Sequence, residues 1–191
     1  ISQGIRPDSH LHIRSLNVSL HAMRTTSFKS MECPTARALD CIGESWTLLI
    51  LRDALQGCTR FDEFQRSVGI ATNTLTRRLK RLVDQGLLER RRYMTRPTRY
   101  EYVLTQMGID LFPLLVVLFD WGSKYLVNDG VAVQQIDRES GRVLESVVVD
   151  RTDLRPITVD RVLLKAGPVA SAAVHERVEQ VRELRESASG S

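Results

Sequence analysis

Basic side chains gather in one short part of this sequence, between residues 77 and 99. Nine basic residues stand there against two acidic ones, so this stretch has a net charge of +7, whereas the whole 191-residue chain has +4. Clustered cations favour a polyanion partner, because binding to phosphates releases condensed counterions. A solvated charged face is the alternative explanation for such a run. The nine basic residues are Arg77, Arg78, Lys80, Arg81, Arg90, Arg91, Arg92, Arg96 and Arg99.

Three cysteines offer a second kind of chemistry. Cys33, Cys41 and Cys58 form no CxxC pair and no even-numbered set, which is typical of a reducing compartment and predicts a cytoplasmic protein. Cys33 precedes Pro34 at the start of a predicted helix, where the partial positive charge favours the thiolate. Cys33 is therefore a candidate redox or electrophile sensor. The alternative is a small, half-buried packing residue.

Catalytic motifs are missing from the sequence. There is no HExxH, no P-loop, no GxGxxG after a strand and no GxSxG, and the four histidines lie outside the predicted core. We therefore expect no enzyme activity, no cofactor and no metal site. No apolar run reaches the roughly 18 residues that a membrane helix needs, so we expect no membrane partner.

Apolar spacing predicts the helices that must position these residues. One helix is expected from Pro34, and a second, capped by Ser45, over the strongly apolar WTLLILRDALQ. RFDEFQRSV then gives a short helix, Gly69 a turn, and ATNTLTRRLKRLVDQGL a longer helix. A short helix, a tight turn and a longer helix predict a helix-turn-helix motif.

The longer helix of this motif is amphipathic and leads into a hairpin. Leu75, Leu79 and Leu82 fall within a narrow arc, while basic residues project from the other side. LLERRRY and YEYVL flank a turn that contains proline, which predicts a β-hairpin. The expected fold class is mainly α with a β-hairpin wing, a winged helix-turn-helix core with a small β-containing C-terminal extension.

A last long helix is predicted from Thr105, its cap, to about Val127. Its apolar residues exceed what one small domain must bury, so we expect a partner chain to cover them. Pro113 should kink this helix unless it falls within the first turn or two.

The chain divides into three predicted regions. Residues 1–32 form a flexible N-terminal segment, 33–127 the winged helix-turn-helix for DNA binding and dimerisation, and 128–191 a β-rich extension with a charged tail. Met23 and Met31 lie shortly before the first organised segment, and we hypothesise that residues 1–22 are not native. In the extension, VAVQQI and VLESVVV predict short strands, and HERVEQVRELRE predicts a short exposed helix or disorder.

The sequence resembles the HxlR-type regulators, winged-helix relatives of the MarR group, from about Cys33 to Tyr125. The matching stretches are CPTARALDCIGESWTLLILRDAL, TRFDEFQRSVGI, TNTLTRRLKRLVDQGLLERR, RYEYVLTQMG and FDWG. The resemblance implies a homodimer, joined by its first and last helices, that binds a palindromic operator on double-stranded DNA. Repression is the commoner mode in this family. The Cys-Pro pair matches too, and in several relatives that cysteine senses electrophiles or oxidants.

Family roles can be carried over to particular positions of this sequence. The start of the recognition helix should meet base edges, because Asn can bond adenine and Arg guanine in two places. Two deeper residues would hold phosphates, and the hairpin tip would reach the neighbouring minor groove or its backbone. Ala71 stands where relatives usually place a capping Ser, so we expect the cap to shift to Thr72. The base-reading residues are Thr72, Asn73, Thr74, Thr76 and Arg77, the phosphate-binding residues Lys80 and Arg81, and the wing residues Arg96 and Arg99.

Two questions stay open from the sequence. Trp46, Phe119 and Trp121 could line a pocket for a small-molecule effector, or could instead pack in the core. The function we favour is a sequence-specific transcriptional regulator acting on the nucleoid. The alternative is a winged-helix protein-interaction or ligand-binding module without DNA specificity.

Overall fold

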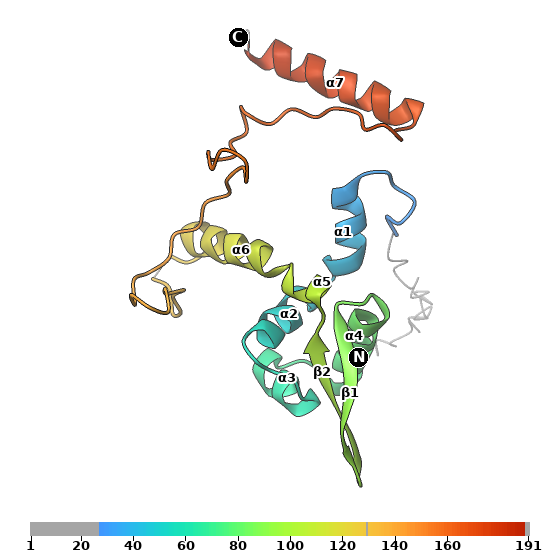
Figure 1. Cartoon of the computed structure of the whole chain (residues 1–191), viewed down its shortest axis with the longest axis vertical. Coiled ribbons are helices and arrows are strands. Elements are labelled where there is room, and N and C mark those ends of the chain that lie inside the picture. Colours follow the sequence, from blue (N-terminus) through green and yellow to red (C-terminus); the bar gives the residue numbers. More distant parts are fainter. Residues whose placement is uncertain (1–26, 129, 190–191) are drawn as a thin grey trace, which may run out of the picture.

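The computed structural model describes residues 27–128 and 130–189 (Figure 1). The predicted flexible N-terminal segment, including residues 1–22, therefore lies mostly outside the described residues. None of the described helices is long and apolar enough to cross a membrane. The elements are α1 (Pro34–Ile42), α2 (Thr47–Leu55), α3 (Phe61–Val68), α4 (Thr72–Asp84), β1 (Leu88–Thr95), β2 (Thr98–Leu104), α5 (Gln106–Ile109), α6 (Phe112–Tyr125) and α7 (Ala172–Ser189).

The first two helices begin close to the predicted positions. Pro34 opens α1, where a missing N–H costs nothing, and the Gly43 N–H bonds the Leu39 carbonyl at the other end. The cap expected from Ser45 is wrong by one position: Trp46 is the N-cap of α2, and no side chain accepts a hydrogen bond there. The N–H of Thr47, the first residue of α2, donates instead to the Glu44 carbonyl at 2.9 Å.

Helices α3 and α4 form the predicted helix-turn-helix. The Glu63 carboxylate accepts from the N–H groups of Thr59 and Arg60, both at 2.9 Å, and so fixes the start of α3. Gly69, with φ of 69°, closes the turn between the helices. The expected shift of the α4 cap is wrong, because Ala71 is the N-cap and the Thr72 hydroxyl accepts from Gln65 Nε2 instead.

One apolar cluster holds these helices and the base of the hairpin together. Leu75, Leu79 and Leu82 of α4 are at most 1% exposed, as their spacing predicted. They pack with apolar residues of the other elements, chiefly Ile50, Leu51, Phe64, Leu87 and Leu88. The orientation of α4 is therefore fixed by a dry, close-packed face.

The predicted hairpin is confirmed. Strands β1 and β2 pair antiparallel, from Leu88 opposite Leu104 to Thr95 opposite Thr98 at the tip. The Leu87 N–H bonds the Leu82 carbonyl at 2.9 Å, so the hairpin continues directly from the end of α4. Figure 1 shows it projecting away from the helices as a wing.

The helix predicted from Thr105 to Val127 is in fact two helices. Thr105 caps the short α5 by accepting from the Gly108 N–H at 3.2 Å. Pro113 lies in the first turn of α6, where a missing N–H is tolerated, and it therefore starts a helix and does not kink one. Helix α6 contains no buried residue.

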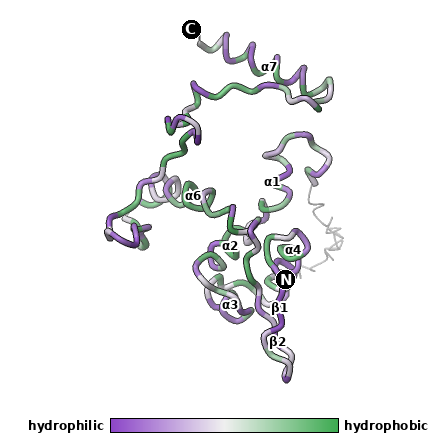
Figure 2. The backbone as a smooth tube through the Cα atoms, viewed as in Figure 1, coloured by the Kyte–Doolittle hydropathy of each residue, from purple (hydrophilic) through white to green (hydrophobic). Residues whose placement is uncertain are grey.

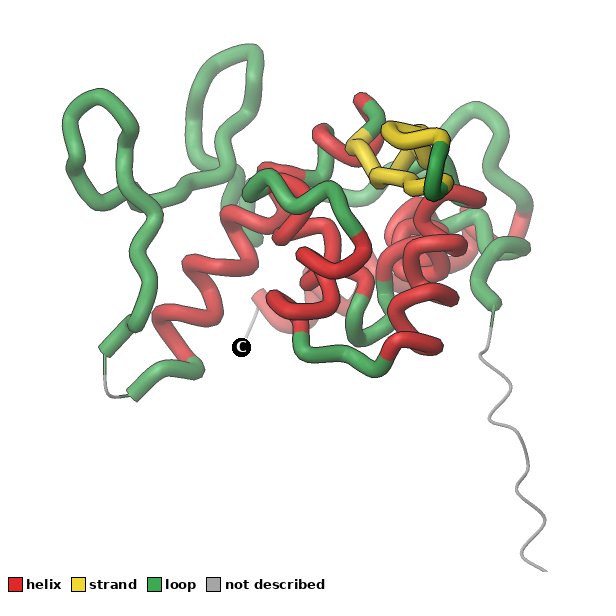
Figure 3. The backbone as a smooth tube through the Cα atoms, turned by 90° about the horizontal axis from the view of Figure 1, so that it is seen from below, coloured by secondary structure: helices red, strands yellow, loops and turns green. Residues whose placement is uncertain are grey.

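The C-terminal extension differs from the strands expected of it. Within residues 130–171 the described backbone forms only single bridges, Ile136 with Val143 and Val149 with Pro156, and Figure 3 draws this segment as loops. Each apolar run folds back over a tight turn, and neither gains a neighbouring strand among the described residues. The charged tail is the helix α7. The mainly α fold with a hairpin wing is confirmed.

Candidate nucleic-acid interface

The outward face of α4 is polar and uncovered. Thr72, Asn73, Thr76 and Arg77 are exposed, and Thr74 is half-buried. The Thr76 hydroxyl donates to the Thr72 carbonyl at 2.9 Å, which leaves its oxygen lone pairs available outward. Because the opposite leucine face is packed, these side chains are presented on a rigid helix. This face offers donors and acceptors of the kind that base edges bind.

Lys80 continues the same face one turn further on. Its ammonium lies 2.6 Å from the Asp84 carboxylate, and both side chains are largely exposed. Exposed pairs of this kind are weak and are screened by salt. Lys80 can therefore leave Asp84 for a phosphate at little cost.

Arg81, which we expected at a phosphate, is engaged inside the protein. Its guanidinium pairs with Glu44 at 3.0 Å and donates to the Asp40 carbonyl at 2.7 Å. Arg78 pairs with the other oxygen of Glu44. No sequence pattern paired Glu44 with Arg78, because Glu44 lies between α1 and α2, whereas Arg78 lies on α4, far along the chain.

The wing carries arginines in two kinds of surroundings. The Arg90 guanidinium lies 3.5 Å from the centre of the Tyr100 ring, and Arg60, the N-cap of α3, lies 5.0 Å from that of Tyr93 in β1. Arg91 instead pairs with Glu89 at 2.9 Å, and this hydrogen bond holds the pKa of the Glu89 carboxyl below its usual value. Because Arg91 and Glu89 cancel each other's charge, the net positive charge of the wing comes mainly from its other arginines.

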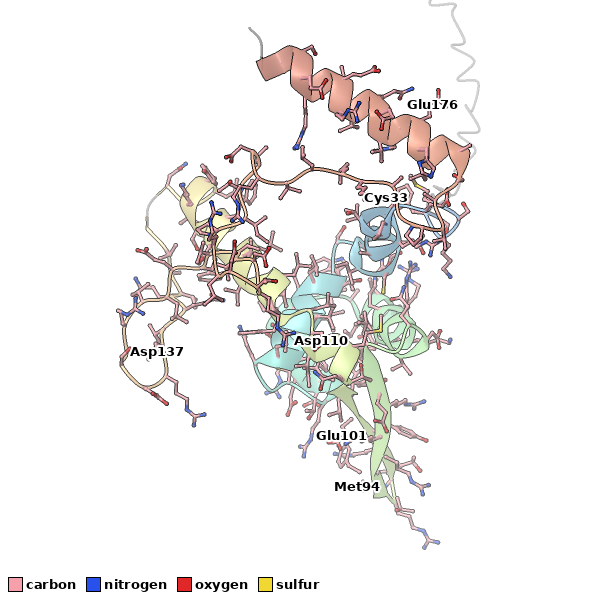
Figure 4. The ribbon with its side chains drawn as sticks, turned by 45° about the horizontal axis from the view of Figure 1, so that its top comes forward. Cys33, Met94, Glu101, Asp110, Asp137 and Glu176 are labelled. Atoms are coloured by element: carbon pink, nitrogen blue, oxygen red, sulfur yellow. The ribbon has the colours of Figure 1, made fainter. Side chains whose placement is uncertain are left out.

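The tip of the wing is exposed and basic. Arg96 and Arg99 are both exposed; Arg96 lies in the turn that joins the strands, and Arg99 lies near the start of β2. Figure 4 marks the tip region by Met94, which pairs with Arg99 across the hairpin. The structure thus presents the polar face of α4 and the two tip arginines on adjoining elements.

The three cysteines lie in different environments. Cys33 is the N-cap of α1, and the backbone N–H of Ala36 is the main reason that its thiol pKa falls below the usual value. Burial raises the pKa of Cys41 and of Cys58. Cys33 also faces the start of α7, where Ser171 donates through its N–H to the Glu32 carboxylate at 3.2 Å (Figure 4).

The predicted effector-pocket residues do not come together. A cavity of about 510 Å³ lies between α2, α6 and residues 133–135, and Phe119 lines it. Trp46 packs against the core, and Trp121 is 51% exposed and contacts the Tyr125 ring at 5.9 Å. Phe119 shares the cavity with Leu48 and Arg52 of α2, which no sequence pattern indicated.

Comparison with known proteins agrees with this geometry. The sequence model of the HxlR-like helix-turn-helix family matches residues 41–129. The HTH-type transcriptional regulator YdeP of Bacillus subtilis is 36% identical over 94 residues, which are 49% of this chain and 73% of that protein. The chain belongs to the HxlR-like helix-turn-helix family.

Other relatives match different shares of this HxlR-like chain. The HTH-type transcriptional regulator Rv3095 of Mycobacterium tuberculosis is 51% identical over 90 residues, 47% of this chain and 57% of its own. The chain therefore spans little more than half the length of that relative. The solved structure of PA1607, a candidate transcription factor, is 39% identical with a TM-score of 0.69, and covers 74% of this chain and all of its own. A coverage of 74% of 191 residues is about 141 residues, which is more than the 129 residues from the start of the chain to the end of the family match. This likeness therefore reaches into the extension. The family and these relatives are regulators, not enzymes.

Proposed function

We propose that this HxlR-like protein is a homodimeric, sequence-specific DNA-binding repressor of transcription. The observation that carries the proposal is the polar outer face of α4, held rigid by the buried leucines on its inner face and followed directly by a basic wing. A helix presented in this way fits the major groove, while a hairpin beside it reaches the flanking backbone. A charged face that only solvates the protein would need neither the rigid helix nor the exposed wing tip.

Each exposed residue has a role in this proposal. Asn73 and Arg77 read bases, with Thr72, Thr74 and Thr76 adding contacts to base edges or thymine methyls. Lys80 binds phosphate, and the two arginines of the wing tip enter the neighbouring minor groove or hold its backbone. Arg81 is left out of these contacts because Glu44 and the Asp40 carbonyl already occupy it.

The proposed dimer is supported by the uncovered apolar side chains of α6 and α1. Phe112, Trp121 and Tyr125 are each more than half exposed, as is Leu39 of α1. Apolar surface gathered in this way marks an interaction site in a soluble protein. A two-fold dimer would bind a palindromic operator with half-sites about 34 Å apart or a multiple of that distance.

The extension is proposed to enlarge the same interface by lying on the second copy. Its apolar residues are strongly exposed, with Val159 at 81% and Val169 at 91%, and Figure 2 shows hydrophobic residues along α6 and along parts of the segment that follows it. Acidic and basic residues are nearly equal in number from 130 to 189, which argues against a nucleic-acid role for this part. Removing residues 130–191 should weaken the dimer in sedimentation measurements. An unchanged dimer would contradict this role.

Selection of bound duplexes from genomic DNA tests the main proposal. The expected result is one palindromic site, bound with an affinity that falls steeply with salt, because several phosphates are contacted. Arg77→Ala should weaken that site by about 1–3 kcal/mol and relax its preference at one base pair. Arg138→Ala, in a bridged loop of the extension, is the matched control and should bind like the wild type. A salt-independent interaction, or none, would favour a protein-interaction or ligand-binding module instead.

A second candidate function, release from DNA by thiol modification, is favoured by the surroundings of Cys33. Helix-terminal N–H groups lower the pKa of its thiol, so more of it is nucleophilic thiolate at neutral pH. Addition to an electrophilic alkene such as N-ethylmaleimide forms a C–S bond, and the adjacent carbon takes a proton from water. Treated wild-type protein should lose operator binding while Cys33→Ser keeps it. Equal loss in both proteins would remove this candidate.

A further inference from the structure

Glu44 lies at the junction of α1 and α2 and holds two arginines of α4 at once. One carboxylate oxygen is 3.0 Å from the Arg81 guanidinium, and the other pairs with Arg78. The Glu44 and Arg78 side chains are only 17% and 16% exposed. This cluster is therefore a largely buried bridge between the first helix pair and the helix proposed to read DNA.

The end of α4 is also bonded to the end of α1. Arg81 donates to the Asp40 carbonyl at 2.7 Å, and the Gln85 amide, oriented so that its oxygen accepts from Arg81, donates to the Cys41 carbonyl at 3.1 Å. Helix α1 has no basic residue in its own last turn, although its terminal carbonyls carry partial negative charge. Arg81 of α4 supplies a positive charge next to these carbonyls. The ends of α1 and α4 are therefore joined by both hydrogen bonds and ionic contacts.

Charge balance makes Glu44 the necessary member of the cluster. Burial lowers the pKa of the Arg78 guanidinium, and the nearby charge of Arg81 lowers it further. The two cations therefore oppose each other, and the Glu44 carboxylate lies between them. Without it, two partly buried cations would be left to repel each other or to turn outward toward solvent.

We propose that Glu44 is a positioning residue for DNA recognition, which fixes the angle between α4 and α1 and thereby sets the half-site spacing that the dimer accepts. The inference rests on the proposed function, in which α1 belongs to the dimer interface and α4 to the DNA interface. Glu44 itself touches no DNA. It joins the element that sets the distance between two subunits to the element that each subunit places in a groove.

This role predicts two effects of opposite sign when the charge of Glu44 is removed. Arg78 and Arg81 become free to bind phosphates, so affinity for random duplex should rise and its salt dependence should steepen, by about 0.9 in logarithmic slope for each phosphate gained. Affinity for the selected operator should fall, because α4 is no longer held at one angle. A residue that only stabilised the fold would not separate these two quantities.

The experiment compares Glu44→Gln with Asp84→Asn in the full chain. Asp84 pairs with Lys80 on the same helix but joins no second element, so its removal is the matched control. Binding is measured on the selected operator, on operators with one base pair added to or removed from the spacer, and on random duplex. Thermal unfolding and sedimentation establish that each variant is folded and dimeric. Arg81→Gln, which leaves the Glu44–Arg78 pair in place, serves if Glu44→Gln does not fold.

The expected result for Glu44→Gln is about a tenfold loss on the selected operator and about a threefold gain on random duplex. The preference for the native spacer should drop by a similar factor, while Asp84→Asn keeps that preference. Arg81→Gln should show a smaller loss of spacer preference. Unchanged spacer preference in the tested variant, or a loss of affinity that is equal on all duplexes, overturns the inference and leaves the proposed function standing. Failure of the wild-type protein to bind any duplex overturns both.

Discussion

The part of the chain from Ile42 to Gly108 and the part that follows it use apolar residues in opposite ways. Every buried residue in the described chain lies between these two positions, and none lies in the described residues after Gly108. The later part is nevertheless rich in valine and leucine, and Leu163 is 75% exposed where Phe64 of the earlier part is fully buried. The two parts have a similar share of apolar residues, but among the described residues only the earlier part buries them.

The difference shows which part of the fold one chain can complete. Residues 42–108 close their own core, so the positions of α4 and the wing follow from packing within a single chain. Helix α6 and the extension have apolar faces without enough of the same chain to cover them. In the proposed dimer, the second copy would cover these faces.

Truncation of a core side chain should have the largest effect. Phe64→Ala removes a ring at 0% exposure and should lower the free energy of unfolding by about 3–5 kcal/mol, measured in denaturant. Leu163→Ala should cost less than about 0.5 kcal/mol at concentrations where the protein is a monomer. Equal costs for the two variants at low concentration would break the comparison.

An acidic side chain on α6 should have the next largest effect, and it should act on the dimer. Trp121→Asp removes the same ring from both sides of a two-fold interface. The loss of buried apolar surface should weaken the dimer by about 1.5 kcal/mol or more for each copy. Since each 1.4 kcal/mol is tenfold, the dimer dissociation constant should rise at least about 100-fold in sedimentation equilibrium. Met94→Asp, at a similarly exposed apolar residue of the wing, should leave the dimer intact. An undisturbed Trp121→Asp dimer would place the interface elsewhere.

Most of the packed region could be predicted from the sequence. The leucines of α4 recur at helical spacing, Gly69 adopts the left-handed turn between helices, and Pro97 lies between two strand-forming runs. Each is a local signal, read over a few residues, and each agrees with the tertiary structure. The polar face of α4 followed from the same periodicity.

What could not be predicted depends on partners distant in sequence. Nothing near Arg81 indicates that Glu44 binds it, so a phosphate contact was the natural expectation. The valine-rich runs of the extension have strand propensity, but a strand also needs a neighbour with a free edge, and the described part of the extension forms only single bridges. Trp46 and Trp121 are alike as residues, yet one packs on the core and the other is half exposed.

Lys80 and Arg81, two neighbouring basic residues of α4, show the same contrast between an exposed side chain and one that is bound within the protein. Lys80 is exposed and should contact one phosphate, so Lys80→Ala should reduce the logarithmic salt slope of operator binding by about 0.9. Arg81→Ala should not reduce the slope, because this guanidinium binds Glu44 and a carbonyl within the protein. Filter binding across a range of salt concentrations measures both. A lower slope for Arg81→Ala would return this residue to the DNA interface.

The smallest expected effect concerns Cys33, where the extension approaches the helical region. Its thiol pKa is lowered, chiefly by the Ala36 N–H and in small part by the charge of Arg177 on α7, whereas burial raises the pKa of Cys41 and Cys58. Thiolate is the reactive form, so the rate of alkylation of Cys33 by iodoacetamide should rise at lower pH than that of the other two.

Mass spectrometry of the labelled peptides, followed from pH 6 to pH 10, would measure this order for all three cysteines in one sample. Arg177→Gln removes a positive charge that favours the thiolate, so it should move the Cys33 profile slightly toward higher pH and leave the Cys41 and Cys58 profiles unchanged. A Cys33 profile that does not respond to Arg177→Gln would mean that α7 does not lie near α1 in solution. The uncovered part of the chain would then be independent of the packed part.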